Sequence, residues 1–501
     1  MTIWNGAPGR RRRLGALTIL IGLVSSVAAA QEAETPPELR PYRVLVSAAF
    51  ASDGRLAERS RDEVRGEIAR AADRVYGQMW TPTVRENRWL LPADPRGLER
   101  LTAAEVRSHI KPAGDPNAEP EFDKVFVLAV SVAGAKYTVA GREWDAVSRS
   151  LGPTLTAETW DRRAVGATAF ELLTRLFRPT ATIVEVGNDV DPPFVLLQIR
   201  AGELTPSDPQ QTPVREGDLL APLLRYRSRE TRQVEKIQPL DWTYITVDHV
   251  ARGDATGLAV SGLRSPLGGR RSRLVERAAV RVRPYAEQTR LTIVPGGNED
   301  QPLVAHFIDI VPKLLAREEP QTEPRRVLTD RTGTISLPAD ADRPLAWLYV
   351  RSGEAVLARV PYVAGVESQV TLALPDDSIR LSVEGDLALL QGDLVDTVAR
   401  RATLLALAKR SAEKGEWDKV PGYFAEVEKL PGVEEFRADL TAIRVAGVEE
   451  ANRAGDRSAA RRIQRLCGQT GELIDVYLSE EKLRVFREGI DELRKAQGRS
   501  T

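Results

Sequence analysis

The hydrophobic pattern of this chain changes abruptly at Gly385. Before that residue, short apolar runs alternate with Gly, Pro, Asp and Asn, which is typical of β-strands joined by turns; after it, Leu, Ala, Glu, Arg and Lys repeat at helical spacing. One hydrophobic core cannot serve all 501 residues, because domains usually hold about 100 to 200 residues. The sequence therefore predicts a multidomain α+β protein that ends in a helical domain.

Two apolar runs of strand length indicate an α/β sandwich over residues 42–180. The run YRVLVSAAF begins at Tyr42, and VFVLAVSVAG occupies residues 125–134. Between them, Thr102 is followed three residues later by Glu105, a capping box that predicts the start of a helix. We expect the order strand, helix, helix, strand, strand, helix, with helices packed on a sheet.

The helical period is lost over the next two segments, and both are predicted to be β-domains. Residues 181–295 alternate short apolar runs with turn residues, the pattern of a small β-barrel or β-sandwich. Residues 296–384 contain seven strand-like runs, the last of them SIRLSVE at 378–384, and this density favours a second β-sandwich.

One stretch of the second β-domain carries a family resemblance. TDRTGTISLP at residues 329–338 resembles the turn of transthyretin-like and carboxypeptidase-regulatory-like β-sandwiches. In those proteins the Asp and the Gly close a hairpin, so the resemblance implies that Asp330 and Gly333 are structural turn residues here. It also implies an immunoglobulin-like or transthyretin-like module that acts as a rigid spacer or adhesion unit, and it implies no catalytic residue.

Residues 385–501 are predicted to fold as helical hairpins. The segments 414–430 and 454–466 both place a Gly and an acidic residue ahead of an amphipathic helix. They resemble repeats of the tetratricopeptide kind, which have a period of about 34 residues; a plain helical bundle is the alternative. The surface of this domain carries many charges of both signs, and we expect it to bind a protein partner.

The N-terminus has the three parts of an export signal. Arg10–Arg13 form a basic start, Leu14–Val27 form an apolar stretch, and Ala28 and Ala30 are the small residues that a signal peptidase needs before a cut at Gln31.

We therefore expect residues 1–30 to be a signal peptide and residues 31–41 to be a short acidic tether. The exported protein would be periplasmic or extracellular, or membrane-anchored if the leader is retained. After cleavage no transmembrane segment is expected, because no second apolar run in the sequence approaches 18 residues.

Familiar catalytic signatures are missing from the sequence. It contains no GxxxxGK[ST], HExxH or GxSxG motif. Its single cysteine, Cys467, excludes an intramolecular disulfide and a cysteine-based zinc site, and its three histidines (109, 249 and 306) lie in different segments. We expect no catalytic residue, no metal and no cofactor.

A dense basic stretch runs from residue 264 to residue 283. Its candidate anion-binding residues are Arg264, Arg270, Arg271 and Arg273. However, 60 of the 71 basic residues in the chain are Arg, so arginine clusters carry less weight here, and a solvated strand face is the alternative. The formal net charge of zero gives no general attraction to nucleic acid, which we do not expect as a partner.

These observations favour an exported, non-catalytic multidomain protein of a bacterial envelope, with a scaffold or protein-binding role. Two alternatives stay open. One is an extracytoplasmic hydrolase with a carboxylate pair in the α/β domain, and the other is a module that binds an anionic polymer through the basic stretch.

Overall fold

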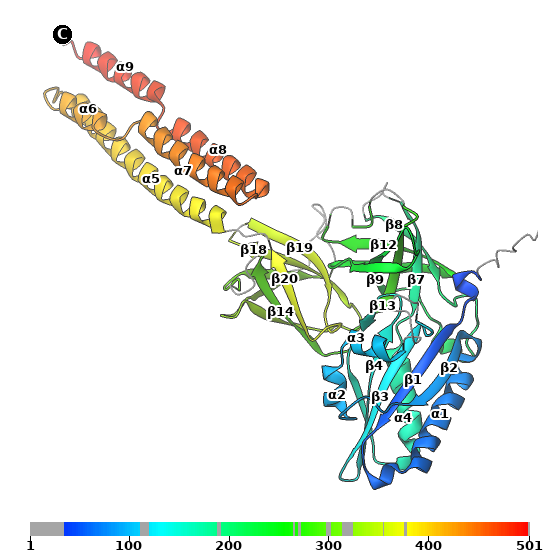
Figure 1. Ribbon diagram of the computed structural model, residues 1–501. Coiled ribbons are helices and arrows are strands. Elements are labelled where there is room, and N and C mark those ends of the chain that lie inside the picture. Colours follow the sequence, from blue (N-terminus) through cyan, green and yellow to red (C-terminus); the bar gives the residue numbers. More distant parts are fainter. Residues whose placement is uncertain are drawn as a thin grey trace, which may run out of the picture.

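The chain forms a mixed α+β protein in which several β-sheets are followed by C-terminal helices (Figure 1). Three β-containing modules lie together, and the helices extend from them as an arm whose far end holds the C-terminus (Figure 1). The computed structural model describes residues 35–110, 120–187, 192–263, 266–268, 272–296, 302–312, 324–353, 355–374 and 378–498.

The first module is a sheet covered by helices on both faces. Its strand order is β2-β1-β3-β4-β5, with β6 also paired to β4; β1, β2 and β3 are parallel and the other pairs are antiparallel. Helices α1 and α4 pack on one face, and α2 and α3 on the other. The elements are β1 (Tyr42–Phe50), α1 (Glu58–Tyr76), β2 (Trp80–Glu86), α2 (Pro95–Arg100), α3 (Ala103–Ile110), β3 (Lys124–Ala133), β4 (Lys136–Asp145), β5 (Ser150–Leu151), β6 (Leu155–Thr159) and α4 (Val165–Leu176).

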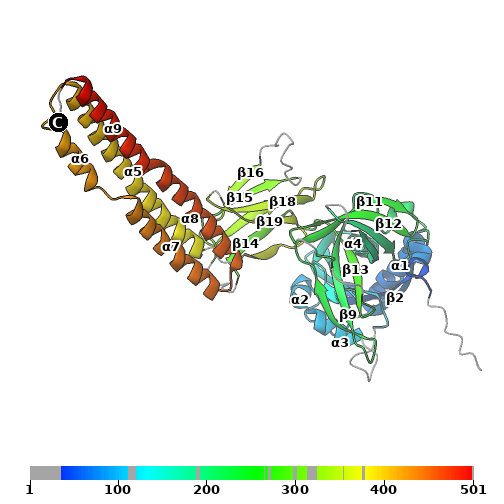
Figure 2. The ribbon, with the colours of Figure 1, turned by 90° about the horizontal axis from the view of Figure 1, so that it is seen from above.

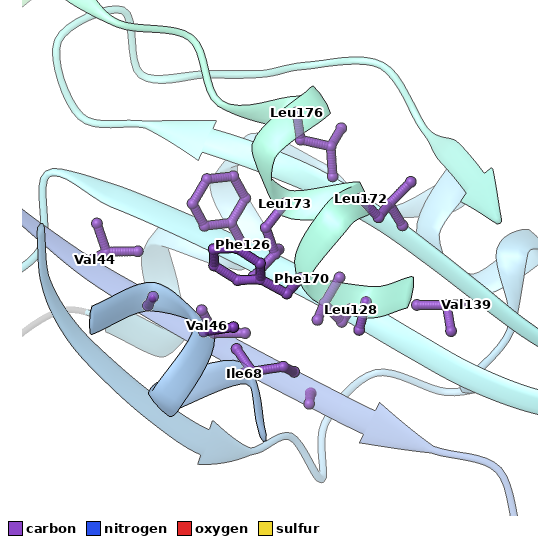
Figure 3. Packing of buried hydrophobic residues seen from close by; sticks show 14 of the residues in the cluster. Val44, Val46, Ile68, Phe126, Leu128, Val139, Phe170, Leu172, Leu173 and Leu176 are labelled. Carbon is purple, nitrogen blue, oxygen red and sulfur yellow. The ribbon is translucent and has the colours of Figure 1, made fainter. Parts of the chain in front are cut away.

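Strand β3 shows why this module needs helices on both sides. Phe126 and Leu128 belong to the core beneath α1 and α4 (Figure 3), whereas Val125 and Val127 belong to the core beneath α2 and α3. Side chains alternate between the two faces of a strand, so a strand buried on both faces must be apolar throughout.

Strand β2 is absent from the order that we expected for this segment. Its sequence, WTPTVRE, contains Pro82 and Arg85, and it lies at the edge of the sheet beside β1. An edge strand tolerates proline and charge because one side of it is unpaired, and its apolar signal is correspondingly weak.

The second module is a closed antiparallel barrel. The ring runs β9-β11-β12-β8-β7-β13 and closes where β13 pairs with β9, while β10 is added outside the ring on β9. The strands are β7 (Thr180–Gly187), β8 (Phe194–Ile199), β9 (Leu219–Arg227), β10 (Val234–Pro239), β11 (Thr243–Ala251), β12 (Asp254–Ser261) and β13 (Val275–Val282).

The third module has two sheets that share one core. A three-stranded sheet has the order β17-β14-β20, and a four-stranded sheet has the order β16-β15-β18-β19. Leu291 of the first sheet and Leu348 of the second belong to the same buried cluster. The strands are β14 (Gln288–Pro295), β15 (Phe307–Val311), β16 (Arg325–Leu328), β17 (Thr334–Pro338), β18 (Leu345–Ser352), β19 (Ala355–Val363) and β20 (Gln369–Leu374).

The turn that contains Asp330 and Gly333 connects these two sheets. Oδ1 of Asp330 accepts hydrogen bonds from the backbone N–H groups of Thr332 (2.8 Å) and Thr334 (3.0 Å), and the Thr332 hydroxyl bond leads the contacts that lower the pKa of Asp330. Gly333 has φ +65°, and a Cβ there would lie 2.6 Å from Cβ of Pro302. Because β16 and β17 belong to different sheets, this turn does not close a hairpin, unlike the turn that it resembles.

The arm is built on one long helix, α5. The first part of α5 packs with α7 and α8 around one core, and its last turns pack with α6 and α9 around another (Figure 2). No helix in the described part of the chain is both long and apolar enough to cross a membrane. The helices are α5 (Ser378–Glu413), α6 (Val420–Glu428), α7 (Val433–Arg453), α8 (Arg457–Tyr477) and α9 (Glu480–Ala496).

Helix α5 begins seven residues before the expected boundary at Gly385. The run SIRLSVE, expected to be a strand, forms its first two turns. Arg380 is buried there and is paired with Glu384 one helical turn later. The alternation in this run fits both periods over so short a length, so the strand prediction was wrong.

Candidate functional site

A crevice of about 750 Å³ lies between the first module and the barrel. Its walls come from the start of β1, the residue before β3, the end of β8, and strands β9 and β13. It therefore lies at the amino ends of the parallel strands. Ligands of open α/β sheets usually bind at the opposite, carboxyl ends, so the common sites of such sheets are no guide to this one.

Arginine dominates the described lining of the crevice. Six arginines face two acids, which leaves a formal surplus of four positive charges. A concave wall of one charge sign concentrates ligands of the opposite sign, and the guanidinium fork matches the oxygens of phosphates and carboxylates. The arginines are Arg40, Arg43, Arg149, Arg200, Arg225 and Arg227, and the acids are Asp123 and Glu276.

The first acid joins the two modules; we call Asp123 with its two arginines the Asp123 clamp. Oδ2 of Asp123 accepts from Nε of Arg43 at 3.2 Å and from Nη2 of Arg200 at 2.5 Å, while Oδ1 accepts from Nη2 of Arg43 at 3.1 Å. Arg43 belongs to β1 and Arg200 follows β8, so this carboxylate ties the sheet module to the barrel.

The second acid is shared in the same way within the barrel; we call Glu276 with its two arginines the Glu276 clamp. Its two carboxylate oxygens accept from Nη1 of Arg225 at 2.9 Å and from Nη2 of Arg227 at 3.0 Å. The two arginines are two residues apart on β9 and therefore point to the same face of the strand, and β13 places Glu276 directly opposite Arg225.

Each clamp keeps one buried donor unused. The Nε atoms of Arg200 and Arg225 are buried and have no hydrogen-bond partner in the described part of the protein. Their side chains are only 15% and 13% exposed, and the guanidinium of Arg200 lies 5.1 Å from the ring centre of Tyr42, which helps to fix its position. An unpaired buried N–H is costly, and the described residues satisfy neither guanidinium completely.

A second ionic cluster, the Lys124 network, lies next to the crevice but is closed to it. Nζ of Lys124 lies 2.8 Å from Oε1 of Glu143 and 2.7 Å from Oδ2 of Asp145, and it also donates to the backbone carbonyl of Arg178. All three ionic side chains are 0% exposed.

Burial opposes both charged forms within this network, but neighbouring charge prevails. Burial alone would lower the pKa of Lys124, and the carboxylates of Asp145 and Glu143 outweigh it and raise that pKa. Burial alone would raise the pKa of Asp145, and Lys124 and Arg178 outweigh it and lower that pKa. Lys124 and Asp145 are thus both held in their charged forms in the interior.

Part of the expected tether forms one wall of the crevice. Within residues 35–41, the carbonyls of Pro37 and Glu38 accept from the backbone N–H groups of Ala201 and Glu203, each at 3.0 Å. The carbonyl of Pro41 accepts from Nη2 of Arg200 at 3.0 Å. These residues are therefore bound to the barrel instead of hanging free.

The basic residues singled out from the sequence are not those that line the crevice. Arg273 is exposed ahead of β13 and is not part of the lining. The same stretch does supply two residues of the crevice lining, Ala278 and its only acid, Glu276. Arg264, Arg270 and Arg271 lie outside the described residues, as do the cleavage residues Ala28 and Ala30.

The three histidines lie apart and are each engaged locally. His109 stacks on Trp89 with 4.4 Å between ring centres, Nδ1 of His249 lies 2.9 Å from Oε1 of Glu216, and Nδ1 of His306 lies 2.9 Å from the carbonyl of Val304. No group of three or more metal-ligating side chains occurs in the described ranges.

The comparisons with known proteins identify no family for this chain. No family model and no curated protein matches this chain. Among solved structures, TolB from Acinetobacter baumannii is similar at 10% sequence identity, with a TM-score of 0.18 over 66% of this chain and 83% of that one. A TM-score of this size is too low to assign a common fold.

Proposed function

We propose that this chain is an exported, non-catalytic binding protein of the bacterial envelope, and that it holds an anionic ligand in the crevice between the sheet module and the barrel. One observation carries the proposal: the described lining of the crevice holds six arginines and two acids, and two of these arginines keep a buried N–H without a partner among the described residues. The anion-binding alternative is thus relocated from the basic stretch to the crevice. Export rests on the leader at residues 1–30.

The hydrolase alternative gains no support from the acids of the first module. Glu143 and Asp145 are inaccessible and both are bound to Lys124, so neither can reach a substrate. In the crevice, Asp123 and Glu276 each already accept hydrogen bonds from two arginines. A general acid needs a proton to give and access to the bond that it protonates, and these carboxylates suit a binding role better.

The C-terminal domain at residues 385–501 remains the proposed surface for a protein partner. In favour of this role, one face of α8 exposes three large apolar side chains at helical spacing: Leu473, Val476 and Tyr477. The test is photo-cross-linking of the full chain in its own envelope, with a photoreactive residue at position 476. The control places the same photoreactive residue at position 434, which is exposed at the start of α7. Labelling of one protein from both sites, or from neither, would count against the α8 face.

The crevice is tested by calorimetric titration of the exported protein with tripolyphosphate at low salt. We expect Arg225→Gln to weaken binding by roughly 10- to 150-fold, because it removes a charge-assisted hydrogen bond worth about 1.5 to 3 kcal/mol. Arg351→Gln is the matched control: Arg351 shares the carboxylate of Asp309 with Arg326 in the same manner, but it lies in the third module, away from the crevice lining.

The control should bind like the wild type. Equal losses in both variants would mean a diffuse charge effect, and an absence of binding to the wild-type protein would overturn the proposal.

A further inference from the structure

The two clamps repeat one arrangement inside a single cavity. In each, one carboxylate is shared by two arginines, and in each the more deeply buried arginine keeps an unpaired Nε. The Asp123 clamp draws on both modules, whereas the Glu276 clamp belongs to the barrel alone. The crevice therefore offers two separate donor sites on one continuous wall.

The size of the cavity bears on what could occupy both sites. About 750 Å³ falls within the range of roughly 300 to 1,000 Å³ that is typical of pockets for molecules of drug or cofactor size. A single phosphate or acetate at one clamp would leave the arginines of the other clamp without a ligand. A chain with several oxyanion groups could satisfy both at once.

We propose that the crevice selects a ligand with at least two oxyanion groups on one chain, one group bound at each clamp, as in an oligophosphate or an acidic oligosaccharide. This inference rests on the proposed anion-binding function and adds a requirement for two-point binding. Once the first group is bound, the second binds from a high effective concentration, so affinity rises with chain length far beyond the statistical increase in groups.

The experiment is a calorimetric titration series on the exported full-length protein with inorganic phosphate, tripolyphosphate and oligogalacturonate. We expect the better of the two oligoanions to bind at least roughly a hundredfold more tightly than phosphate, within the range that linked binding events reach. The two oligoanions distinguish phosphate from carboxylate sources, and a clear preference for either one supports the inference.

Single-clamp variants test the two-point requirement directly. Arg225→Gln should remove most of the advantage of the oligoanion while changing phosphate binding only about twofold, because the Asp123 clamp still holds one group. Arg200→Gln should do the same at the Asp123 clamp. If that variant does not fold, Arg200→Lys replaces it, because it keeps a positive charge next to Asp123 but loses the guanidinium fork.

Glu276→Gln should change the affinity for the oligoanion in the opposite direction. It removes a competing carboxylate, so we expect tighter oligoanion binding, by roughly twofold to tenfold for one added unit of positive charge near a protein surface. Weaker binding would contradict the assignment of Arg225 and Arg227 as ligand-facing donors.

The two proposals fail in different ways. If neither phosphate nor either oligoanion binds, anion binding in the crevice itself is wrong. If phosphate and the oligoanions bind with the same affinity per group, or if the single-clamp variants weaken phosphate and oligoanion equally, anion binding stands and two-point selection is overturned.

Discussion

The Lys124 network and the crevice are adjacent regions built from the same kinds of side chain, yet they differ in closure and in charge balance. In the network, Lys124 and Arg178 face Glu143 and Asp145, so two cations meet two carboxylates in a region without solvent. In the crevice, six arginines meet two carboxylates around an open cavity. Balanced charges in a closed space hold a fold together, whereas arginines gathered around an open cavity attract anions from solution.

The largest expected effect comes from breaking the balance of the buried network. Lys124→Met leaves two buried carboxylates with Arg178 as their one remaining cation, and breaking a buried ionic network in this way costs about 3 to 5 kcal/mol. Lys136→Met is the matched control, because Lys136 makes a partly exposed pair with Glu158 at 2.7 Å, of a kind worth about 1 kcal/mol or less. Urea unfolding followed by tryptophan fluorescence measures both. Equal stabilities for the two variants would remove the distinction between the network and surface pairing.

A second expectation concerns acid. The folded-state pKa of Asp145 lies below its ordinary value of 3.8, so its contribution to stability is present at neutral pH and is lost as pH falls through the folded pKa. The pKa of Lys124 is raised above 10.5, so its contribution persists at neutral pH and is lost only in strong alkali. Wild-type protein should therefore lose stability below about pH 4.

The same reasoning reverses for the variant without Lys124. Without Lys124, Asp145 loses the nearest positive charge that lowers its pKa and becomes easier to protonate, so Lys124→Met should approach wild-type stability as pH falls from 7 to 5. Thermal melts across this range measure the difference between the two proteins. A difference that stays constant with pH would show that Lys124 contributes through packing alone.

The smallest effects should come from the crevice acids, and they should differ between the clamps. Asp123 is 10% exposed and joins two modules, so Asp123→Asn should cost about 1 to 3 kcal/mol. Glu276 is 28% exposed, and Glu276→Gln should cost less than about 1 kcal/mol. Urea unfolding gives both values, and greater damage from Glu276→Gln would reverse the structural ranking of the two clamps.

Elements with a strong period could be predicted from the sequence, and weakly patterned ones could not. The apolar runs that became β1 and β3 are buried on both faces, and the capping box at Thr102 is formed: its backbone N–H donates to Oε2 of Glu105 at 2.8 Å, with Oγ1 accepting from the N–H of Glu105 at 3.3 Å. Strand β2 was missed because pairing with β1, not its own apolar pattern, makes it a strand.

The crevice was beyond prediction for a different reason. Its arginines come from segments up to 187 positions apart in the sequence, between Arg40 and Arg227, and only the packing of the barrel against the sheet brings them together. In a chain with 60 arginines, no single segment of the crevice stands out. The one local signal was the pair Arg225 and Arg227, spaced to share a strand face within an otherwise apolar run.

The long helix of the arm also determines how the molecule moves in solution. With 36 residues, α5 spans roughly 54 Å at 1.5 Å per residue, and it extends away from the three β-containing modules (Figure 1). The particle should therefore sediment and diffuse more slowly than a sphere of equal mass. A protein bound at the exposed face of α8 and a ligand in the crevice would be held on different parts of this elongated molecule.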